Sequence, residues 1–269
     1  MHSLIITLLQ SFLHWENKTA NLSMFTNKVD SIKEKTQIIV LPEMFSTGFT
    51  MRPEVFAETM NGETVGWLRK TAIAKRVILT GSIIIHENDE YYNRLIWMLP
   101  NGEHTYYDKR HLFAYAGEDL HYTSGLKRLI TSVNGWKINL QICYDLRFPV
   151  WVRQQINVND KKNIEPEYDL LVYIANWPER RNHAWKTLLQ ARAIENQCYV
   201  IGVNRVGNDG NNIYHSGDSM AINPVGEVLY QKAHEEEIFT IELKRDILDE
   251  IRMKFPFWKD ADNFTIINE

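Results

Sequence analysis

The residue whose side chain is the clearest candidate for a chemical role is Cys143, which directly follows the apolar run 136–142. That run predicts a buried strand, and the segment after it predicts a helix with Pro149 in its first turn. Cys143 is therefore expected at a strand-to-helix elbow, where its sulfur faces the carboxyl edge of a sheet and the next backbone N–H groups can surround a reacting oxygen. Taken by its position alone, Cys143 could equally be a small residue of the core.

Two charged side chains also follow predicted strands. Glu43 comes after the short apolar run 37–41 and sits among aromatic residues and Met44, where a carboxylate is costly unless it is paired or protonated. Lys109 follows the strand 103–107 and precedes an apolar Leu-Phe pair. Taken singly, Glu43 could cap a helix or lie at the surface, and Lys109 could be an exposed lysine.

Together these three residues could support nucleophilic catalysis. An unperturbed cysteine is only about 3% thiolate at pH 7, so it needs a base or a cation nearby. No histidine flanks Cys143, which leaves a Cys–His pair without local support. Glu43 could instead take the thiol proton, while Lys109 and the N–H of Tyr144 stabilise the charge on a carbonyl oxygen.

Composition excludes several other classes of function. The chain has 269 residues, a formal net charge of -4, 44% hydrophobic residues and 24% charged residues, as expected of a soluble globular protein. This charge provides no footprint for nucleic acid or for an anionic membrane. Residues 1–10 lack a basic n-region and predict a first strand rather than a signal peptide. No apolar run reaches the roughly 18 residues of a membrane span.

The reactive residue types argue against disulfides, metals and cofactors. Cys143 and Cys198 are the only two cysteines in the sequence, so a disulfide framework is not expected. We therefore expect the protein in a reducing compartment, the cytoplasm. The nine histidines are scattered and do not indicate a metal site. The HExxH, CxxC, GxSxG, P-loop and GxGxxG motifs are absent from the sequence, so we expect no cofactor.

The hydrophobic pattern alternates strands with helices, and hairpins interrupt the alternation. Strands are predicted at 3–10, 37–41, 77–85, 93–99, 103–107, 136–142, 168–175, 199–204, 214–222, 227–231 and 237–243. Helices are predicted at 16–35, 63–75, 147–157, 179–197 and 243–251. Turn residues at 100–102 and 223–226 predict two hairpins. We therefore expect a layered α/β protein with mixed sheets, and a single domain over 1–269, because no linker divides the chain.

In this order, the segments resemble motifs of the nitrilase superfamily of carbon–nitrogen hydrolases. The matching stretches are Leu41-Pro-Glu43, Tyr107-Asp-Lys-Arg-His-Leu-Phe113 and Ile142-Cys-Tyr-Asp-Leu-Arg-Phe-Pro149, with support from Ala175-Asn-Trp-Pro178, Gln190–Asn196 and Gly217-Asp-Ser219. The resemblance extends over about residues 3–260. It implies a four-layer αββα sandwich with two mixed sheets and a catalytic triad of Glu43, Lys109 and Cys143. It also implies a second acid near the triad, with Glu118 as the candidate and Asp119 as the alternative.

Within the superfamily, segments 44–49 and 173–178 resemble the bacterial omega-amidases. That resemblance implies hydrolysis of the side amide of 2-oxoglutaramate or 2-oxosuccinamate, with a Cys143 thioester, release of ammonia and no cofactor. Arg147 is the candidate for binding the substrate carboxylate, because a planar guanidinium suits a carboxylate. Arg147 could alternatively pair with a structural acid near the helix start. Phe45 and Trp177 are further candidates for substrate contact.

Three readings of the function follow from this resemblance. In the first, the chain is an omega-amidase whose partners are a small amide and water. In the second, the same chemistry acts on an N-carbamoyl acid, a nitrile or another aliphatic amide. In the third, the chain is a non-catalytic binding scaffold, which loss of a triad residue would have favoured. Superfamily members also pair through two helices, here 148–156 and 179–197, so a homodimer or a larger homo-oligomer is expected.

Overall fold

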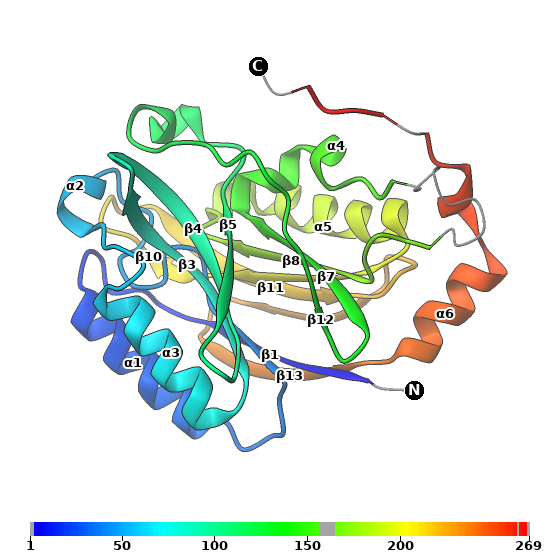
Figure 1. Ribbon diagram of the computed structural model, residues 1–269, viewed down its shortest axis with the longest axis horizontal. Coiled ribbons are helices and arrows are strands. Elements are labelled where there is room, and N and C mark those ends of the chain that lie inside the picture. Colours follow the sequence, from blue (N-terminus) through cyan, green and yellow to red (C-terminus); the bar gives the residue numbers. More distant parts are fainter. Residues whose placement is uncertain (1–2, 156–164, 263, 268–269) are drawn as a thin grey trace.

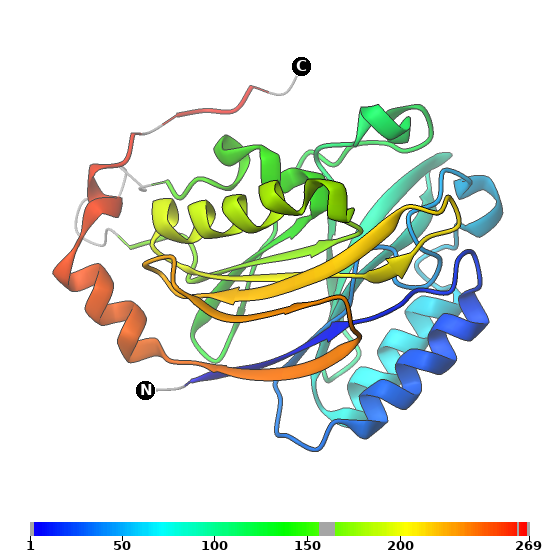
Figure 2. The same ribbon diagram turned by 180° about the vertical axis from the view of Figure 1, so that it is seen from behind.

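The computed structural model describes residues 3–155, 165–262 and 264–267. Two mixed β-sheets lie face to face at its centre, with helices on both outer sides (Figure 1). This arrangement confirms the expected α/β class with two mixed sheets. Viewed from behind, α1 (Lys18–Ser31) and α3 (Glu63–Lys75) lie side by side against one sheet, while α5 (Asn182–Asn196) lies against the other (Figure 2).

The first sheet has the strand order β13-β1-β2-β3-β4-β5. Its parallel centre consists of β1, β2 and β3, and the other neighbours are antiparallel. The strands are β1 (Leu4–Gln10), β2 (Ile38–Val40), β3 (Ile78–Glu87), β4 (Glu90–Met98), β5 (His104–Asp108) and β13 (Glu237–Leu243). Helices α1 (Lys18–Ser31), α2 (Pro53–Phe56) and α3 (Glu63–Lys75) accompany it.

The second sheet has the order β10-β11-β9-β8-β7-β6, with β12 paired to β11. Here β7, β8 and β9 are parallel neighbours. The strands are β6 (Ile130–Val133), β7 (Trp136–Ile142), β8 (Leu170–Ala175), β9 (Tyr199–Asn204), β10 (Val206–Asn208), β11 (Tyr214–Ile222) and β12 (Val228–Ala233). Helices α4 (Pro149–Val152) and α5 (Asn182–Asn196) follow β7 and β8 of this sheet, whereas α6 (Arg245–Lys254) follows β13 of the first sheet.

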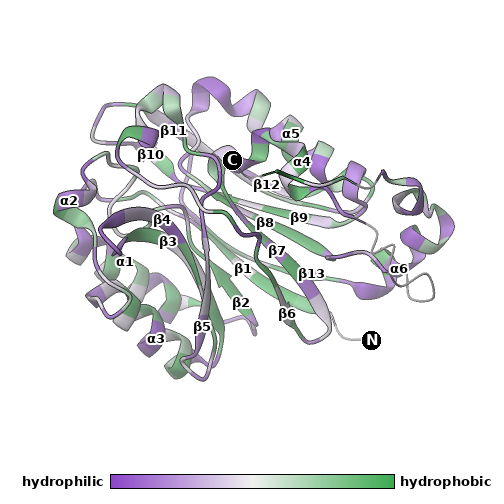
Figure 3. Ribbon diagram, turned by 45° about the horizontal axis from the view of Figure 1, so that its top comes forward, coloured by the Kyte–Doolittle hydropathy of each residue, from purple (hydrophilic) through white to green (hydrophobic). Residues whose placement is uncertain are grey.

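Strand β2 is buried on both of its faces, which explains why all of its residues are apolar. Ile38 and Val40 belong to the core between the sheets. Ile39 belongs to the core between the first sheet and helices α1 and α3. Successive side chains of a strand point to opposite faces, so a strand buried on both sides reads as an unbroken apolar run. Figure 3 shows the same pattern, with apolar residues dominating the central strands.

The prediction of one helix over 147–157 is wrong. Cys143–Arg147 form a short 3₁₀ helix, and α4 covers only Pro149–Val152, with proline at its first position as expected. Arg153 is already out of the helical region, and residues 156–157 lie outside the described part of the chain. Three short elements, α2, β6 and β10, are absent from our prediction, because segments of three or four residues carry no readable periodicity. Among the described residues, no helix is long and apolar enough to cross a membrane.

Candidate active site

Glu43, Lys109 and Glu118 form a buried ionic cluster between the two sheets. The Nζ atom of Lys109 lies 2.9 Å from Oε1 of Glu43 and 2.9 Å from Oε2 of Glu118. All three side chains are fully buried, where unpaired charges would be strongly unfavourable. Burial alone would lower the pKa of Lys109, but the charges of Glu118 and Glu43 outweigh it and the pKa is raised. The ammonium group is therefore held in its charged form.

Two asparagines fix the position of Glu43. The side-chain amide of Asn93 on β4 donates to Oε1 of Glu43 at 2.8 Å. The backbone N–H of Asn176, directly after β8, donates to Oε2 at 2.8 Å, and its side-chain amide donates to the Glu43 carbonyl at 2.6 Å. The carboxyl ends of β2 and β8 therefore meet at one carboxylate. This agrees with the general rule that ligand sites in α/β sheets form beyond the carboxyl ends of strands.

The second acid beside Lys109 is Glu118, while Asp119 is exposed to solvent. Besides Lys109, the Glu118 carboxylate accepts the backbone N–H of Phe113 at 2.6 Å. Burial raises the pKa of Glu118, Lys109 opposes the rise, and the net pKa remains above its ordinary value. Of the two candidate acids, Glu118 is therefore the one that lies beside Lys109.

Cys143 begins the 3₁₀ helix at the end of β7, at the predicted elbow. Its backbone φ is +45°, a left-handed conformation that is uncommon outside glycine. Burial and the Glu43 charge raise the pKa of the Cys143 thiol well above its ordinary value, although Lys109 opposes them. In the resting site the proton therefore lies on sulfur, next to the carboxylate that can accept it.

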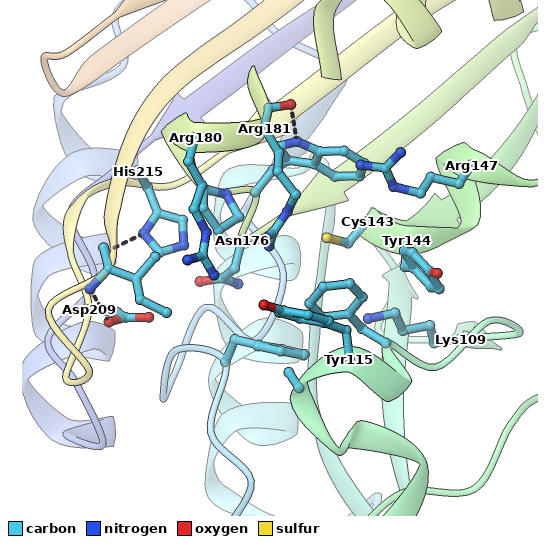
Figure 4. A pocket seen from close by; sticks show the side chains of 16 residues that line it. Lys109, Tyr115, Cys143, Tyr144, Arg147, Asn176, Arg180, Arg181, Asp209 and His215 are labelled. Carbon is cyan, nitrogen blue, oxygen red and sulfur yellow. Dashed lines mark hydrogen bonds between the residues drawn. The ribbon is translucent and has the colours of Figure 1, made fainter. Parts of the chain in front are cut away.

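A cavity of about 260 Å³ opens in front of Cys143 (Figure 4). Tyr144 lies in its wall and in the first turn of the 3₁₀ helix, where N–H groups have no acceptor within the helix. The remaining walls are largely aromatic or cationic. They include Phe49, Phe113, Tyr115, Trp177, Arg147, Arg180, Arg181, Asp209 and His215.

The arginines of this cavity have no acidic partner among the residues that the structure describes. Arg147 lies over the ring of Trp177 at 4.9 Å, and Arg181 lies over the ring of Phe113 at 5.0 Å. Burial and the neighbouring Arg180 lower the pKa of Arg181. Asp209, the one acid in the described cavity wall, uses its Oδ1 atom to accept two backbone N–H groups of its own loop. The cavity therefore carries an excess of positive charge.

Trp177 lines the cavity, whereas Phe45, the other residue predicted to contact substrate, does not. Phe45 is fully buried in the core beneath α1 and α3, against the rings of Phe25 and Trp67. The backbone turns at Met44, where φ is +43°, so Glu43 before it joins the ionic cluster while Phe45 after it packs in the outer core. Phe49 occupies the cavity instead, 5.0 Å below the Lys109 ammonium.

Our sequence analysis did not select Asn93 or Arg181 as site residues. Asn93 lies within a strand, where nothing in the sequence distinguishes a polar residue near a site from one facing solvent. Arg181 had a readable signal, because it closes the run Trp-Pro-Glu-Arg-Arg after the Asn176 segment. Arg147 was selected, and its alternative role, pairing with a structural acid, finds no acid partner in the described chain.

His215 gives the cavity wall a measurable pH dependence. It is 2% exposed, and its Nδ1 donates to the carbonyl of Ile213 at 2.9 Å. Burial, assisted by the charge of Arg205, lowers the pKa of His215 to about 4. Since the unfolded chain binds this proton near pH 6.5 and the folded chain does not, stability is present above pH 6.5 and is lost on acidification towards pH 4.

We expect His215→Asn to remove about 2 kcal/mol of the stability difference between pH 7 and pH 5, because asparagine keeps the donor to Ile213 but does not titrate. Urea unfolding of both proteins at the two pH values measures this difference. His183→Asn, at an exposed position of α5, is the matched control and should leave the wild-type difference in place. An unchanged pH dependence in His215→Asn would show that His215 is protonated in the folded protein.

Comparison with known proteins agrees with this geometry. Residues 6–253 match the sequence model of a family described as carbon-nitrogen hydrolase. The chain belongs to the carbon–nitrogen hydrolase family. The expected nitrilase-superfamily resemblance is thereby confirmed, and with it the assignment of the chain as an amidase-type enzyme.

Relatives of this carbon–nitrogen hydrolase match over nearly their whole length. It is 44% identical to "Omega-amidase YafV" of Escherichia coli K12, over 99% of this chain and 100% of that one. It is 31% identical to "2-oxoglutaramate amidase" of Bacillus subtilis, over 95% and 96% of the two chains. The crystal structure of XC1258 from Xanthomonas campestris, described with an arsenic adduct in its active site, is 39% identical, with a TM-score of 0.95 and coverage of 99% and 100%.

Proposed function

We propose that this carbon–nitrogen hydrolase is an omega-amidase that hydrolyses the terminal amide of a linear 2-oxo acid, such as 2-oxoglutaramate or 2-oxosuccinamate. The observation that carries the proposal is the positive wall of the cavity beside Cys143, where Arg147 and Arg181 have no acidic partner within the described part of the chain. A partly buried cation without an acidic protein partner favours an anionic ligand. The names of the 44% and 31% identical relatives support the same substrate class.

The proposed reaction uses Cys143, Glu43 and Lys109 as a triad. Glu43 takes the thiol proton as the sulfur attacks the amide carbon, and the developing oxyanion is stabilised by the Lys109 ammonium and the Tyr144 N–H. The C–N bond then breaks as Glu43 returns the proton to nitrogen, so ammonia leaves and a thioester remains. Glu43 next takes a proton from water, whose oxygen attacks the thioester and releases the free acid and the Cys143 thiol.

Glu118 has a different place in this proposal. It contacts Lys109 through both carboxylate oxygens, at 3.0 and 2.9 Å. Glu43 must be free to gain and lose a proton, and Glu118 keeps a negative charge against Lys109 while it does so. Glu118 therefore positions the ammonium group rather than transferring protons.

Ammonia release from a panel of small amides tests the substrate. We expect turnover of 2-oxoglutaramate and 2-oxosuccinamate, and kcat/KM about 10- to 100-fold lower for propionamide, because a charge-assisted contact is worth roughly 1.5–3 kcal/mol. Preferred turnover of an N-carbamoyl acid or a nitrile would replace the proposed substrate but keep the chemistry. No turnover of any of them, together with an unreactive Cys143, would identify a binding scaffold.

Arg147→Lys tests recognition of the carboxylate. Lysine keeps the charge but loses the planar fork that binds two carboxylate oxygens, so we expect KM for 2-oxoglutaramate to rise about tenfold while kcat changes less. Propionamide, which has no carboxylate, is the matched control and should show no such rise. An unchanged KM for 2-oxoglutaramate would return Arg147 to a structural role.

We also propose that the chain forms a homodimer or a larger homo-oligomer. We place it in the cytoplasm, a reducing compartment, because both of its cysteines are free thiols. Val150 on α4 and Ile194 on α5 are each 55% exposed, which gives these two helices apolar surface to bury. A standard interface buries about 1,600 Å² in total. Sedimentation equilibrium at micromolar concentration should give at least twice the chain mass of 31.6 kDa, and a mass of 31.6 kDa throughout would rule out the dimer.

A further inference from the structure

Asp145, a buried carboxylate outside the proposed triad, forms hydrogen bonds with the segment that carries Cys143 and with the segment that carries Lys109. Asp145 is fully buried two residues after Cys143. Its Oδ2 atom accepts the backbone N–H of Ile142 at 3.0 Å and the hydroxyl of Tyr107 at 2.8 Å. Its Oδ1 atom accepts the backbone N–H of His111 at 2.9 Å and lies 2.8 Å from Nδ1 of the same residue. Four donors thus converge on one side chain.

These donors belong to two different parts of the chain. Ile142 directly precedes Cys143, at the end of β7 in the second sheet. Tyr107 and His111 lie two residues before and two residues after Lys109, in and just beyond β5 of the first sheet. Asp145 therefore holds the nucleophile segment and the lysine segment at a fixed separation across the interface between the sheets.

The position of the sulfur needs such support. Cys143 has a φ of +45°, and a non-glycine residue keeps this strained conformation only where its surroundings enforce it. The N–H of the preceding residue is anchored by Asp145, and the ring of His111 stacks on Phe148 beyond the elbow at 3.8 Å. The strained turn is therefore held from both ends by one network.

We propose that Asp145 is a positioning residue for the reaction: through Ile142 and His111 it sets the distance between the Cys143 sulfur, Glu43 and the Lys109 ammonium. It does not touch the substrate, since it does not line the cavity. Nor does the inference depend on which amide is the substrate, because it concerns the thiol and its base alone. A displacement of about 1 Å in a catalytic group can cost roughly 10²-fold in rate.

Asp145→Asn is the first test, because it keeps the size of the side chain but replaces one acceptor oxygen by an NH₂ group that cannot accept. We expect kcat to fall about 100-fold with KM changed less than threefold. Alkylation of Cys143 by iodoacetamide should also slow about tenfold, since the sulfur loses its alignment with Glu43. Alkylation needs no substrate, so it reports on the proposed positioning even if the omega-amidase assignment fails.

A matched pair at His111 separates the hydrogen bond from the packing. His111→Ala and His111→Asn both remove the ring that stacks on Phe148, but asparagine keeps a donor near the place of Nδ1. We expect His111→Ala to lower kcat and the alkylation rate about tenfold, and His111→Asn to recover most of both. This pair decides the question if Asp145→Asn does not fold.

The opposite results would overturn the proposal. Asp145 would be a purely structural residue if Asp145→Asn unfolded at a lower temperature while its folded fraction kept the wild-type kcat and alkylation rate. Equal activities of His111→Ala and His111→Asn would likewise show that the contact with Oδ1 does not set the position of the nucleophile.

Discussion

Cys143→Ala is expected to abolish ammonia release, with a loss of roughly 10⁶-fold in kcat, the scale seen when a catalytic nucleophile is removed. The reason is that every later step proceeds from the bond between sulfur and the carbonyl carbon. The fold should remain, because Cys143 is only half-buried and alanine removes a single atom from the cavity wall. Steady-state kinetics on 2-oxoglutaramate and thermal unfolding measure the two halves of this prediction.

Cys198→Ala is the matched control. Cys198 is fully buried in the core of the second sheet, and burial raises the pKa of its thiol. It does not line the cavity, so we expect wild-type kcat and KM with about 1 kcal/mol lower stability from the lost packing. Equal loss of activity in both variants, with both folded, would contradict the choice of Cys143 as nucleophile.

The strands could be predicted from the sequence because burial on both faces gives an unbroken apolar run, as in Ile38–Val40 and Leu170–Ala175, whereas Trp136–Ile142 alternates apolar and polar residues. The ends of those runs then located the elbow of Cys143 and the position of Glu43. The helix after the elbow was overpredicted. Its Val-Trp-Val sequence is apolar, but the preceding turn is a tighter 3₁₀ helix, in which the Asp145 carboxylate accepts the backbone N–H of Ile142.

Residues that act through tertiary contacts could not be predicted in this way. Asn93 meets Glu43 only because β4 folds back beside β3, and the separation in sequence is 50 residues. Phe45 was misplaced for a related reason, since the left-handed turn at Met44 carries it into the outer core. Local periodicity contains neither of these facts. The type of chemistry could be predicted from residue types, whereas the direction in which each side chain points depends on backbone turns.

Replacing either of the other two residues of the proposed triad should lower kcat/KM at least about 10³-fold, because one oxyanion donor alone is typically worth about 10²–10³ in rate. Glu43→Gln removes the base but keeps the shape and the hydrogen bond from Asn176. Lys109→Ala removes the cation that faces the developing oxyanion. Steady-state kinetics on a confirmed amide substrate measures both, and a loss below tenfold in either variant would remove that residue from the triad.

Stability should separate these two variants even though their activities fall together. Glu43→Gln leaves Lys109 paired with Glu118 at 2.9 Å, so the cluster keeps one ion pair without excess charge. Lys109→Ala leaves two fully buried carboxylates without their cation, and breaking a buried pair in this way costs about 3–5 kcal/mol. Thermal unfolding should therefore place Lys109→Ala well below Glu43→Gln. Equal stabilities would mean that one of the two carboxyl groups takes up a proton when the lysine is lost.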